Sequence, residues 1–302
     1  MPRNALPWST HVNRRADCFP ETLPIAGHPT PSHVADLAVA CLLAAIATWP
    51  KPGLVSHLDN GGHTDIDAQI LRDSAVALEP FFAELAHAGT RNARMPALRR
   101  IGVRAEHRLL NATGGVNTHH GAIFGLGLLC AAAGVRIANR AREHETLGGI
   151  VARLWGSEIM AGARRTASHG AAVARRYGAG GARAEAAQGF PKLYQVGLPA
   201  LRLASGVVGD QFEEARVHAC FALLARLEDT NLLYRGGIEG LRFAQQEARA
   251  FLAAGSIWQR EWWLAASAIH ARFVARKLSP GGTANLLAMS LFVDRWDTGP
   301  TL

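Results

Sequence analysis

The stretch Gly114–Gly134, GGVNTHHGAIFGLGLLCAAAG, joins a polar, glycine-rich turn to an apolar run that carries no charge before Arg136. Such a run is typical of a helix buried in a protein core. The turn leads into the N-terminus of that helix, where the first backbone N–H groups are unpaired and the helix dipole favours negative charge. The stretch therefore predicts a central helix with an anion site at its start.

The polar part of this stretch supplies the groups that such a site needs. We expect Asn117 or Thr118 to cap the helix and Gly121 to let a ligand approach the backbone closely. His119 and His120 stand between them. A second interpretation fits these residues equally well: a capped core helix whose histidines satisfy buried polar groups.

The composition indicates a folded protein with an acidic partner. Hydrophobic residues make up 49% of the 302-residue chain and charged residues 19%, which is a globular composition and not a disordered one. The net charge of +8 at pH 7 suits a nucleic acid, an anionic membrane surface or a phosphorylated small molecule. Because 29 of the 32 basic residues are arginine, codon bias can account for part of this charge.

Several features place the chain in the cytoplasm. The four cysteines lie far apart and form neither a zinc pattern nor a disulfide framework, which fits a reducing compartment. The N-terminus carries Trp8, His11 and Asp17 in place of an apolar signal core. The apolar runs Val34–Trp49 and Ala122–Val135 are shorter than the roughly 20 residues of a membrane span. We expect no membrane contact.

Helical periodicity covers most of the chain and alternating strand patterns are nearly absent, so we expect an all-α fold. Residues 1–31, rich in proline, read as an irregular N-terminal segment, and residues 32–302 read as one helical catalytic domain with its glycine-rich loops at helix N-termini. In detail we expect Ser32 to cap the first helix and Pro80 to kink a later one. We expect loops at Tyr177–Pro199 and at Glu228–Gly237.

The segment Lys51–Asp67 is crowded with polar residues of functional types. Asp65 and Asp67 suit a hard cation such as Mg²⁺ shared with phosphates, with Glu106 as a further ligand. They also suit a helix N-terminus, where carboxylates favour the dipole, and Glu106 suits an intrahelical pair with arginine. Lys51 is either a phosphate contact or a solvated side chain.

Three later segments repeat this combination of glycine and polar side chains. Arg183 and Glu185 lie in a glycine-rich stretch, where the arginine suits a phosphate fork. Asp229–Arg235 follows the end of a helix. Ser279–Thr283, SPGGT, enters an apolar helix and repeats the anion-site pattern of the central stretch.

Common catalytic signatures are missing from the sequence. It has no phosphate loop ending in GK[ST], no GxGxxG after a strand, no HExxH, no GxSxG and no paired CxxC. Glycine-rich loops bearing Asp, Asn, His and Arg instead indicate a site for polyphosphate and a metal ion.

Read in order, these segments resemble one family, the triphosphoribosyl-dephospho-CoA synthases that serve citrate lyase and malonate decarboxylase. The resemblance runs from about residue 35 to the end of the chain. It rests on KPGLV at 51–55, NGGHTDID at 60–67, GVNTHHGAIF at 115–124, GARAEAAQGFP at 181–191, Asp229-Thr230-Asn231 with Arg235, and SPGG at 279–282. The family often has Lys or Arg where this chain has His120, so a charged phosphate ligand at that position is left open.

The resemblance implies a helical cytoplasmic enzyme that joins ATP to the 2′-hydroxyl of 3′-dephospho-CoA and releases adenine. A separate phosphoribosyl-dephospho-CoA transferase then loads the product onto an acyl-carrier subunit. The bond that forms implies a transition state of oxocarbenium type. An α-linked product made from β-linked ATP implies one displacement with inversion, which needs no covalent enzyme intermediate.

The resemblance also implies roles for the matching residues. The catalytic candidates are His63, Asp65, Asp67, His119 and Asp229. The candidates for Mg²⁺ are Asp65, Asp67 and Glu106. The candidates for substrate and phosphate binding are Lys51, Gly53, Asn60, Gly115, Asn117, Thr118, His120, Gly121, Arg183, Glu185, Asn231, Arg235, Ser279, Gly281 and Gly282.

Two other classes of protein compete with this interpretation. A metal-dependent phosphohydrolase on a helical scaffold would use similar His and Asp loops but would release phosphate. A nucleic-acid-binding helical protein fits less well, because the basic residues are spread over many segments with no basic-aromatic patch. We therefore expect small-molecule substrates and no nucleic acid, in a chain that can form a homo-oligomer. The NGGHTDID and THHG forms favour the malonate decarboxylase branch over citrate lyase.

Overall fold

The computed structural model describes residues 29–116, 118–162, 169–208 and 212–298. Throughout these residues the regular structure is helical, with no strand, which confirms the all-α fold class. The helices are α1 Pro31–Ala47, α2 Ala68–Val76, α3 Glu79–Thr90, α4 Met95–Ala112, α5 His120–Ile137, α6 Leu147–Ala161, α7 His169–Tyr177, α8 Gly181–Ala187, the π-helical η1 Leu193–Gly197, α9 Leu198–Val208, α10 Phe212–Arg226, α11 Thr230–Ala253, the short 3₁₀ helix η2 Ser256–Trp258, α12 Trp262–Ala275 and α13 Gly281–Thr298.

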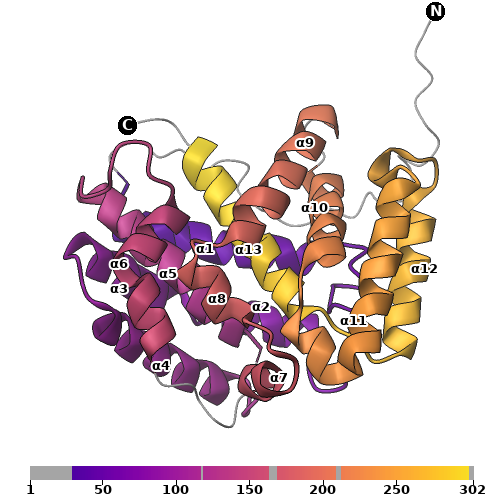
Figure 1. Cartoon of the computed structure of the whole chain (residues 1–302), viewed down its shortest axis with the longest axis horizontal. Coiled ribbons are helices and arrows are strands. Elements are labelled where there is room, and N and C mark those ends of the chain that lie inside the picture. Colours follow the sequence, from indigo (N-terminus) through magenta and orange to yellow (C-terminus); the bar gives the residue numbers. More distant parts are fainter. Residues whose placement is uncertain (1–28, 117, 163–168, 209–211, 299–302) are drawn as a thin grey trace, which may run out of the picture.

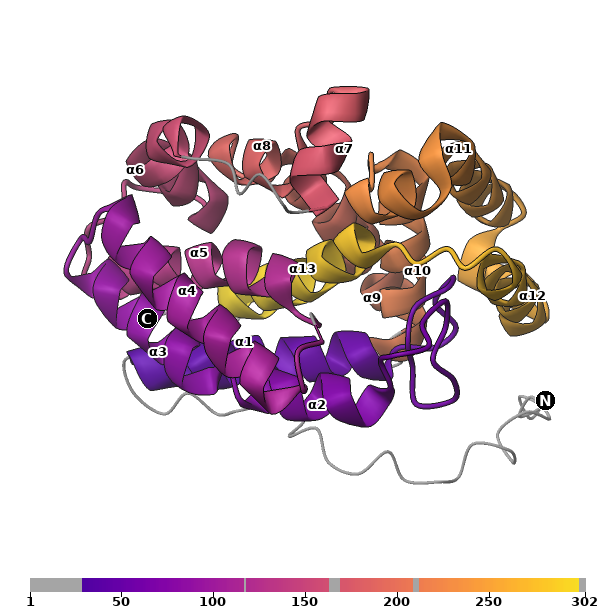
Figure 2. The same ribbon diagram turned by 90° about the horizontal axis from the view of Figure 1, so that it is seen from below.

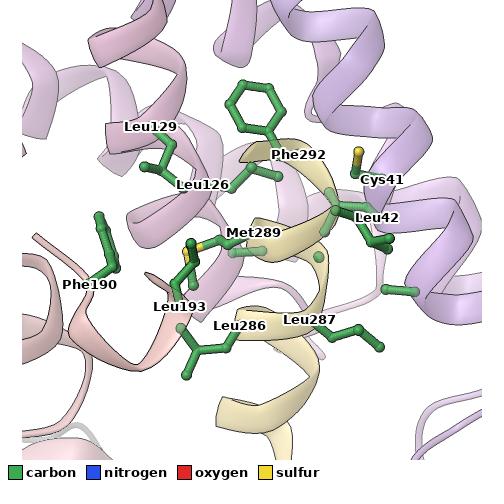
Figure 3. Packing of buried hydrophobic residues seen from close by; sticks show 14 of the residues in the cluster. Cys41, Leu42, Leu126, Leu129, Phe190, Leu193, Leu286, Leu287, Met289 and Phe292 are labelled. Atoms are coloured by element: carbon green, nitrogen blue, oxygen red, sulfur yellow. The ribbon is translucent and has the colours of Figure 1, made fainter. Parts of the chain in front are cut away.

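Helices α5 and α13 occupy the middle of the molecule. Figures 1 and 2 show α13 running between the group of α3, α4 and α6 at one end and the pair α11 and α12 at the other. Side chains of α1, α5 and α13 meet here in one core, and Figure 3 shows Met289 and Phe292 of α13 among Cys41, Leu126 and Phe190. The two helices thus share a core along their middle turns, while their first residues, His120 and Gly281, are only partly buried.

The central stretch of the sequence forms α5, as its apolar run predicts. The helix is buried almost continuously from Ala122 to Val135. Within the described part of the chain, α5 is the one helix long and apolar enough to cross a membrane, yet 72% of that segment is buried in the fold. Burial of this kind is also found in the core helix of a globular domain.

Helices α3 and α5 pack backbone against backbone because each has a glycine at the contact. A Cβ atom built on Gly89 would lie 1.9 Å from the carbonyl oxygen of Ala131, and one built on Gly134 would lie 1.9 Å from the carbonyl oxygen of Ala86. Glycine inside a helix costs about 1 kcal/mol relative to alanine. The close approach of the two helices explains why glycine is nevertheless used at both positions.

The start of the domain differs slightly from expectation. The N-cap of α1 is Thr30, whose side chain accepts from the backbone N–H of His33, so Pro31 is the first helical residue and Ser32 is not the cap. Proline suits this first position because its missing N–H would be unpaired there. Residues 1–28 of the expected irregular segment lie outside the described residues.

Three other details of the sequence prediction are wrong. Pro80 does not kink a helix but lies in the first turn of α3, which begins at Glu79 after α2 has ended at Val76. The expected loop 177–199 contains α8 and the π-helical turn η1, with left-handed glycines at Gly181 and Gly189 allowing the turns between them. The expected turn 228–237 is the first part of α11, within which Gly237 alone has non-helical dihedrals.

We predict that Gly134→Ala lowers the free energy of unfolding by about 1–3 kcal/mol, because the new methyl group meets a backbone carbonyl that cannot move aside. The matched control is Gly102→Ala in α4, where a Cβ would approach nothing closer than Ile123 Cγ2 at 4.0 Å. This control should gain about 0.5–1 kcal/mol from helix propensity. Urea unfolding of both variants tests the prediction, and equal stability of the two would contradict it.

Candidate active site

One cavity of about 1120 Å³ is lined by the segments that the sequence singles out. The volume exceeds the roughly 300–1,000 Å³ of a usual small-molecule site, so it can hold more than one substrate. The predicted residues that line it are Lys51, His63, Asp65, Glu106, Thr118, His119, His120, Gly121, Glu185, Asp229, Asn231, Arg235, Ser279, Gly281 and Gly282.

The buried carboxylate of Asp229 joins the N-termini of α11 and α13. Its Oδ1 accepts from the backbone N–H of Asn231 at 2.9 Å, and its Oδ2 accepts from the backbone N–H and the hydroxyl of Thr283 at 2.8 and 3.1 Å. Burial raises the pKa of Asp229, and these hydrogen bonds oppose the rise. The carboxylate is therefore engaged in holding two helix starts together.

The glycines of the SPGG segment are needed for this junction. A Cβ on Gly282 would lie 3.0 Å from Oδ2 of Asp229, and one on Gly281 would lie 2.7 Å from Nδ2 of Asn231. Both glycines line the cavity. The junction therefore brings two positive helix ends to the same wall of the cavity.

His63 connects Arg235 to Ser279. The Arg235 guanidinium lies 3.2 Å from Nδ1 of His63, and Nε2 of His63 lies 2.9 Å from the buried hydroxyl of Ser279. Burial and then the charge of Arg235 lower the pKa of His63. The same guanidinium lies 3.5 Å from Nε2, and Nδ1 lies 3.8 Å from Oδ1 of Asp65. His63 thus joins a cation, a carboxylate and a hydroxyl at the cavity.

The segment 51–62 is anchored by a histidine that the sequence analysis did not single out. His270 of α12 is buried, with Nδ1 2.6 Å from the carbonyl oxygen of Lys51 and Nε2 3.0 Å from Oδ1 of Asp59. Oδ1 of Asp59 also accepts from the backbone N–H of Gly61. The sequence indicated His270 only as a lone histidine inside an apolar helix. It could not show that Lys51 and Asp59, more than 200 residues away, are its hydrogen-bond partners.

Lys51 is buried beside the C-terminal end of α1. Its ammonium donates to the carbonyl oxygens of Ala45 and Ile46 at 2.6 and 2.9 Å. Burial lowers the pKa of Lys51 to about 8. The side chain lines the cavity, but two of its three donors are held by the helix end.

At the start of α5 the N-cap is His119, which makes no side-chain capping bond, so the expected cap by Thr118 is wrong. The Thr118 hydroxyl donates instead to Ser74 at 3.1 Å. Nε2 of His119 lies 2.9 Å from the carbonyl oxygen of Leu71. The other candidate for the cap, Asn117, lies outside the described residues.

His120 contacts Glu106 at the cavity, with Nδ1 of His120 2.8 Å from Oε1 of Glu106. Glu106 of α4 thus reaches across to α5. The adjacent Gly121 packs against Asn285 of α13, since a Cβ there would lie 2.1 Å from the amide nitrogen. This contact sets α5 against α13 at the cavity.

Several predicted residues lie outside the cavity lining. Asp67 is the N-cap of α2 and accepts from the backbone N–H of Ile70 at 2.8 Å. The Arg183 guanidinium donates to the carbonyl oxygens of Ile159, Met160 and Gly162 at the end of α6. Gly53, Asn60 and Gly115 belong to the turns that carry the cavity residues.

The carboxylates in the cavity suit a metal that substrate helps to bind. Among the described residues there is no group of three or more His, Cys, Asp or Glu side chains able to hold a metal ion. Asp65 and Glu106 both line the cavity, and the Asp65 side chain is 62% exposed. Two carboxylates fit Mg²⁺, which usually takes its remaining ligands from phosphates and water.

The fold and this cavity define a class of protein. It is an all-helical protein whose helix N-termini, arginine and histidine surround one large cavity, an arrangement suited to polyphosphate ligands.

Comparison with known proteins identifies the family. Residues 31–301 match the family described as ATP:dephospho-CoA triphosphoribosyl transferase, also called CitG. A probable 2-(5''-triphosphoribosyl)-3'-dephosphocoenzyme-A synthase of Pseudomonas fluorescens strain Pf-5 is 41% identical over 281 residues, which cover 90% of this chain and 94% of that protein. A protein of the same name from Azotobacter vinelandii strain DJ is 41% identical over 280 residues, with the same coverage.

A third relative of that name, from Pseudomonas syringae pv. syringae strain B728a, is 37% identical over 297 residues that cover 96% of this chain and 95% of the relative. The chain therefore belongs to the ATP:dephospho-CoA triphosphoribosyl transferase family, which confirms the resemblance drawn from its motifs. No solved structure matches the chain.

Proposed function

We propose that this enzyme transfers the triphosphoribosyl group of ATP to the 2′-hydroxyl of 3′-dephospho-CoA and releases adenine. The observation that carries the proposal is the junction at Asp229, where the N-termini of α11 and α13 meet at the wall of a cavity large enough for two nucleotides. Two positive helix ends favour a polyphosphate more than a neutral substrate. Membership of the family supports ATP and dephospho-CoA as the substrates.

The triphosphate binds beside this junction in our proposal. Arg235 and the Ser279 hydroxyl supply donors from the wall, and His63 links the two. Asp65, whose Oδ1 lies 3.8 Å from Nδ1 of His63, and Glu106 would hold Mg²⁺. When bound, Mg²⁺ neutralises charge on the phosphates and so helps the enzyme hold the ribose still.

His119 is the residue that we propose as the general base. A carbonyl oxygen only accepts, so Nε2 of His119 carries the proton that it donates to Leu71, and Nδ1 keeps its lone pair. No described residue hydrogen-bonds to that Nδ1. Burial lowers the pKa of His119, so the ring is neutral at pH 7 and able to take the proton of the attacking hydroxyl.

The other two base candidates are engaged elsewhere. Asp229 accepts hydrogen bonds on both carboxylate oxygens, and His63 lies between Arg235 and Ser279. With His119 as base, one displacement at the anomeric carbon of ATP joins the acceptor oxygen as adenine leaves. That step inverts the configuration and needs no nucleophile from the protein.

The reaction is tested by incubating the protein with ATP, Mg²⁺ and 3′-dephospho-CoA and following the products by chromatography and mass spectrometry. We expect adenine and a triphosphoribosyl-dephospho-CoA in equal amounts, and no reaction once EDTA removes Mg²⁺. Phosphate released without adenine would instead indicate the metal-dependent phosphohydrolase.

The assignment of the base predicts a pH profile. The value of kcat/KM should be level near pH 7 and fall as the pH drops through the pKa of His119, which lies below its ordinary 6.5. His119→Gln should lose about 10²–10⁴-fold in kcat together with this acid limb. His63→Gln should keep the limb and raise mainly the KM for ATP.

Exposed His57, in the same loop as His63 but outside the cavity lining, provides the matched control His57→Gln, which should behave as wild type. The assignment fails when His119→Gln keeps the acid limb, or when the limb disappears in His63→Gln instead.

We propose malonate decarboxylase as the client enzyme, with a separate transferase loading the product onto its acyl-carrier subunit. The proposal is supported by the NGGHTDID and THHG forms of the motifs at 60–67 and 118–121. In cells that lack this chain, the carrier subunit of malonate decarboxylase should remain without its prosthetic group, as measured by intact-protein mass. Loss of the group from the citrate lyase carrier alone would show the other client.

A further inference from the structure

A second cavity adjoins the active site. It has a volume of about 490 Å³ and is lined by Lys192, Ala225, Arg226, Gln245, Arg249 and Leu252. Lys192 lines the large cavity as well, so the two cavities meet at this side chain. Three of the six lining residues are cationic, and no carboxylate is among them.

The side chains of these three cations make few hydrogen bonds or ion pairs with the rest of the described protein. Within the described residues, the side chains of Lys192 and Arg226 form no hydrogen bond and no ion pair. Arg249 makes one long hydrogen bond, 3.4 Å, to the carbonyl oxygen of Ala225. Burial raises the pKa of Glu185, against the opposing effects of the Lys192 backbone N–H, which donates to Oε2 of Glu185 at 3.1 Å, and of the Lys192 charge.

Several other arginines of the described residues pair with neighbouring acids. Examples are Arg153 with Glu145 at 2.6 Å and Arg202 with Asp294 at 2.8 Å. A cluster of three cations around a cavity therefore stands out from the usual pattern of this chain. Like charges that face one cavity repel each other unless an anion lies between them.

A purely structural explanation accounts for only part of the cluster. Arg226 lies in the last turn of α10 and Arg249 reaches the carbonyl of Ala225 in the same turn, and cations are favoured at a helix C-terminus. Lys192 comes from a different segment, directly before η1. No helix C-terminus explains its charge here.

We propose that this second cavity binds the diphosphate of dephospho-CoA while the adenosine end of that substrate lies in the large cavity. This inference rests on the proposed function. The reaction needs two polyphosphate sites, because both substrates carry phosphate chains and their riboses must meet. The junction of α11 and α13 suits the triphosphate of ATP, and the Lys192–Arg226–Arg249 cluster suits the shorter diphosphate.

The chemistry of the cluster fits this ligand. Guanidinium groups bind phosphate oxygens in a bidentate way, and an ammonium adds a point charge. The shared position of Lys192 lets one molecule extend from the large cavity into the second. Leu252 and Ala225 provide an apolar wall beside the charges.

The test compares Lys192→Ala, Arg249→Ala and the double variant in steady-state kinetics with each substrate varied. We expect the KM for dephospho-CoA to rise about 10- to 100-fold, as for the loss of charge-assisted hydrogen bonds, while the KM for ATP stays unchanged. With adenosine as acceptor, which has no phosphate, the variants and the wild type should show the same kcat/KM. Arg242→Ala is the control, since Arg242 lies on α11 outside both cavities and pairs with Glu239.

Calorimetric titration measures the binding of each ligand directly, without the enzyme turning over. The variants should bind dephospho-CoA and inorganic pyrophosphate more weakly than the wild type does, and should bind ATP equally well. The proposal is overturned by an unchanged KM for dephospho-CoA, by a raised KM for ATP instead, or by an equal loss with adenosine. A wild-type protein that releases no adenine would overturn the proposed reaction, whereas the titrations would still show separately whether the cluster binds a diphosphate.

Discussion

The carboxylate of Asp229 is the contact on which the architecture of the active site depends. Burying an anion is costly, and this one is offset by donors from Asn231 at the start of α11 and from Thr283 at the start of α13. One side chain thus caps two helices that are separated by more than 50 residues. The positive ends of both helices thus lie side by side around one carboxylate.

The basic side chains follow a complementary pattern at the other ends of the helices. The Lys51 ammonium binds the last carbonyls of α1, and the Arg183 guanidinium binds those that end α6. Arg235 reaches the carbonyl of Lys277, just after α12, while it also contacts His63. Cations thereby satisfy carbonyl groups at helix C-termini.

Because many basic side chains bind helix-end carbonyls, net charge alone says little about where substrates bind. The chain has a net charge of +8, yet several of its arginines are paired with acids or hold helix ends. In our proposals the charge that serves substrates comes from side chains that line a cavity, Arg235 at the large cavity and the Lys192–Arg226–Arg249 cluster at the second.

The sequence by itself determined the all-helical fold, the buried central helix and the segments that line the cavity. Those features depend on local information: the period of apolar residues, the glycine pairs before helices and the order of the motifs. The identity of the family also followed from motif order, which needs no knowledge of contacts.

Only the tertiary structure decided what each polar side chain does. Asp67 and Arg183 have residue types that fit a metal ligand and a phosphate fork, yet they bind a backbone N–H of α2 and carbonyls of α6. His270 holds the loop at Lys51 and Asp59 from more than 200 residues away, with no local signal for this role. The physical reason is that a hydrogen-bonding side chain binds whichever partner folding brings near it, and such partners are set by long-range packing and not by neighbouring residues.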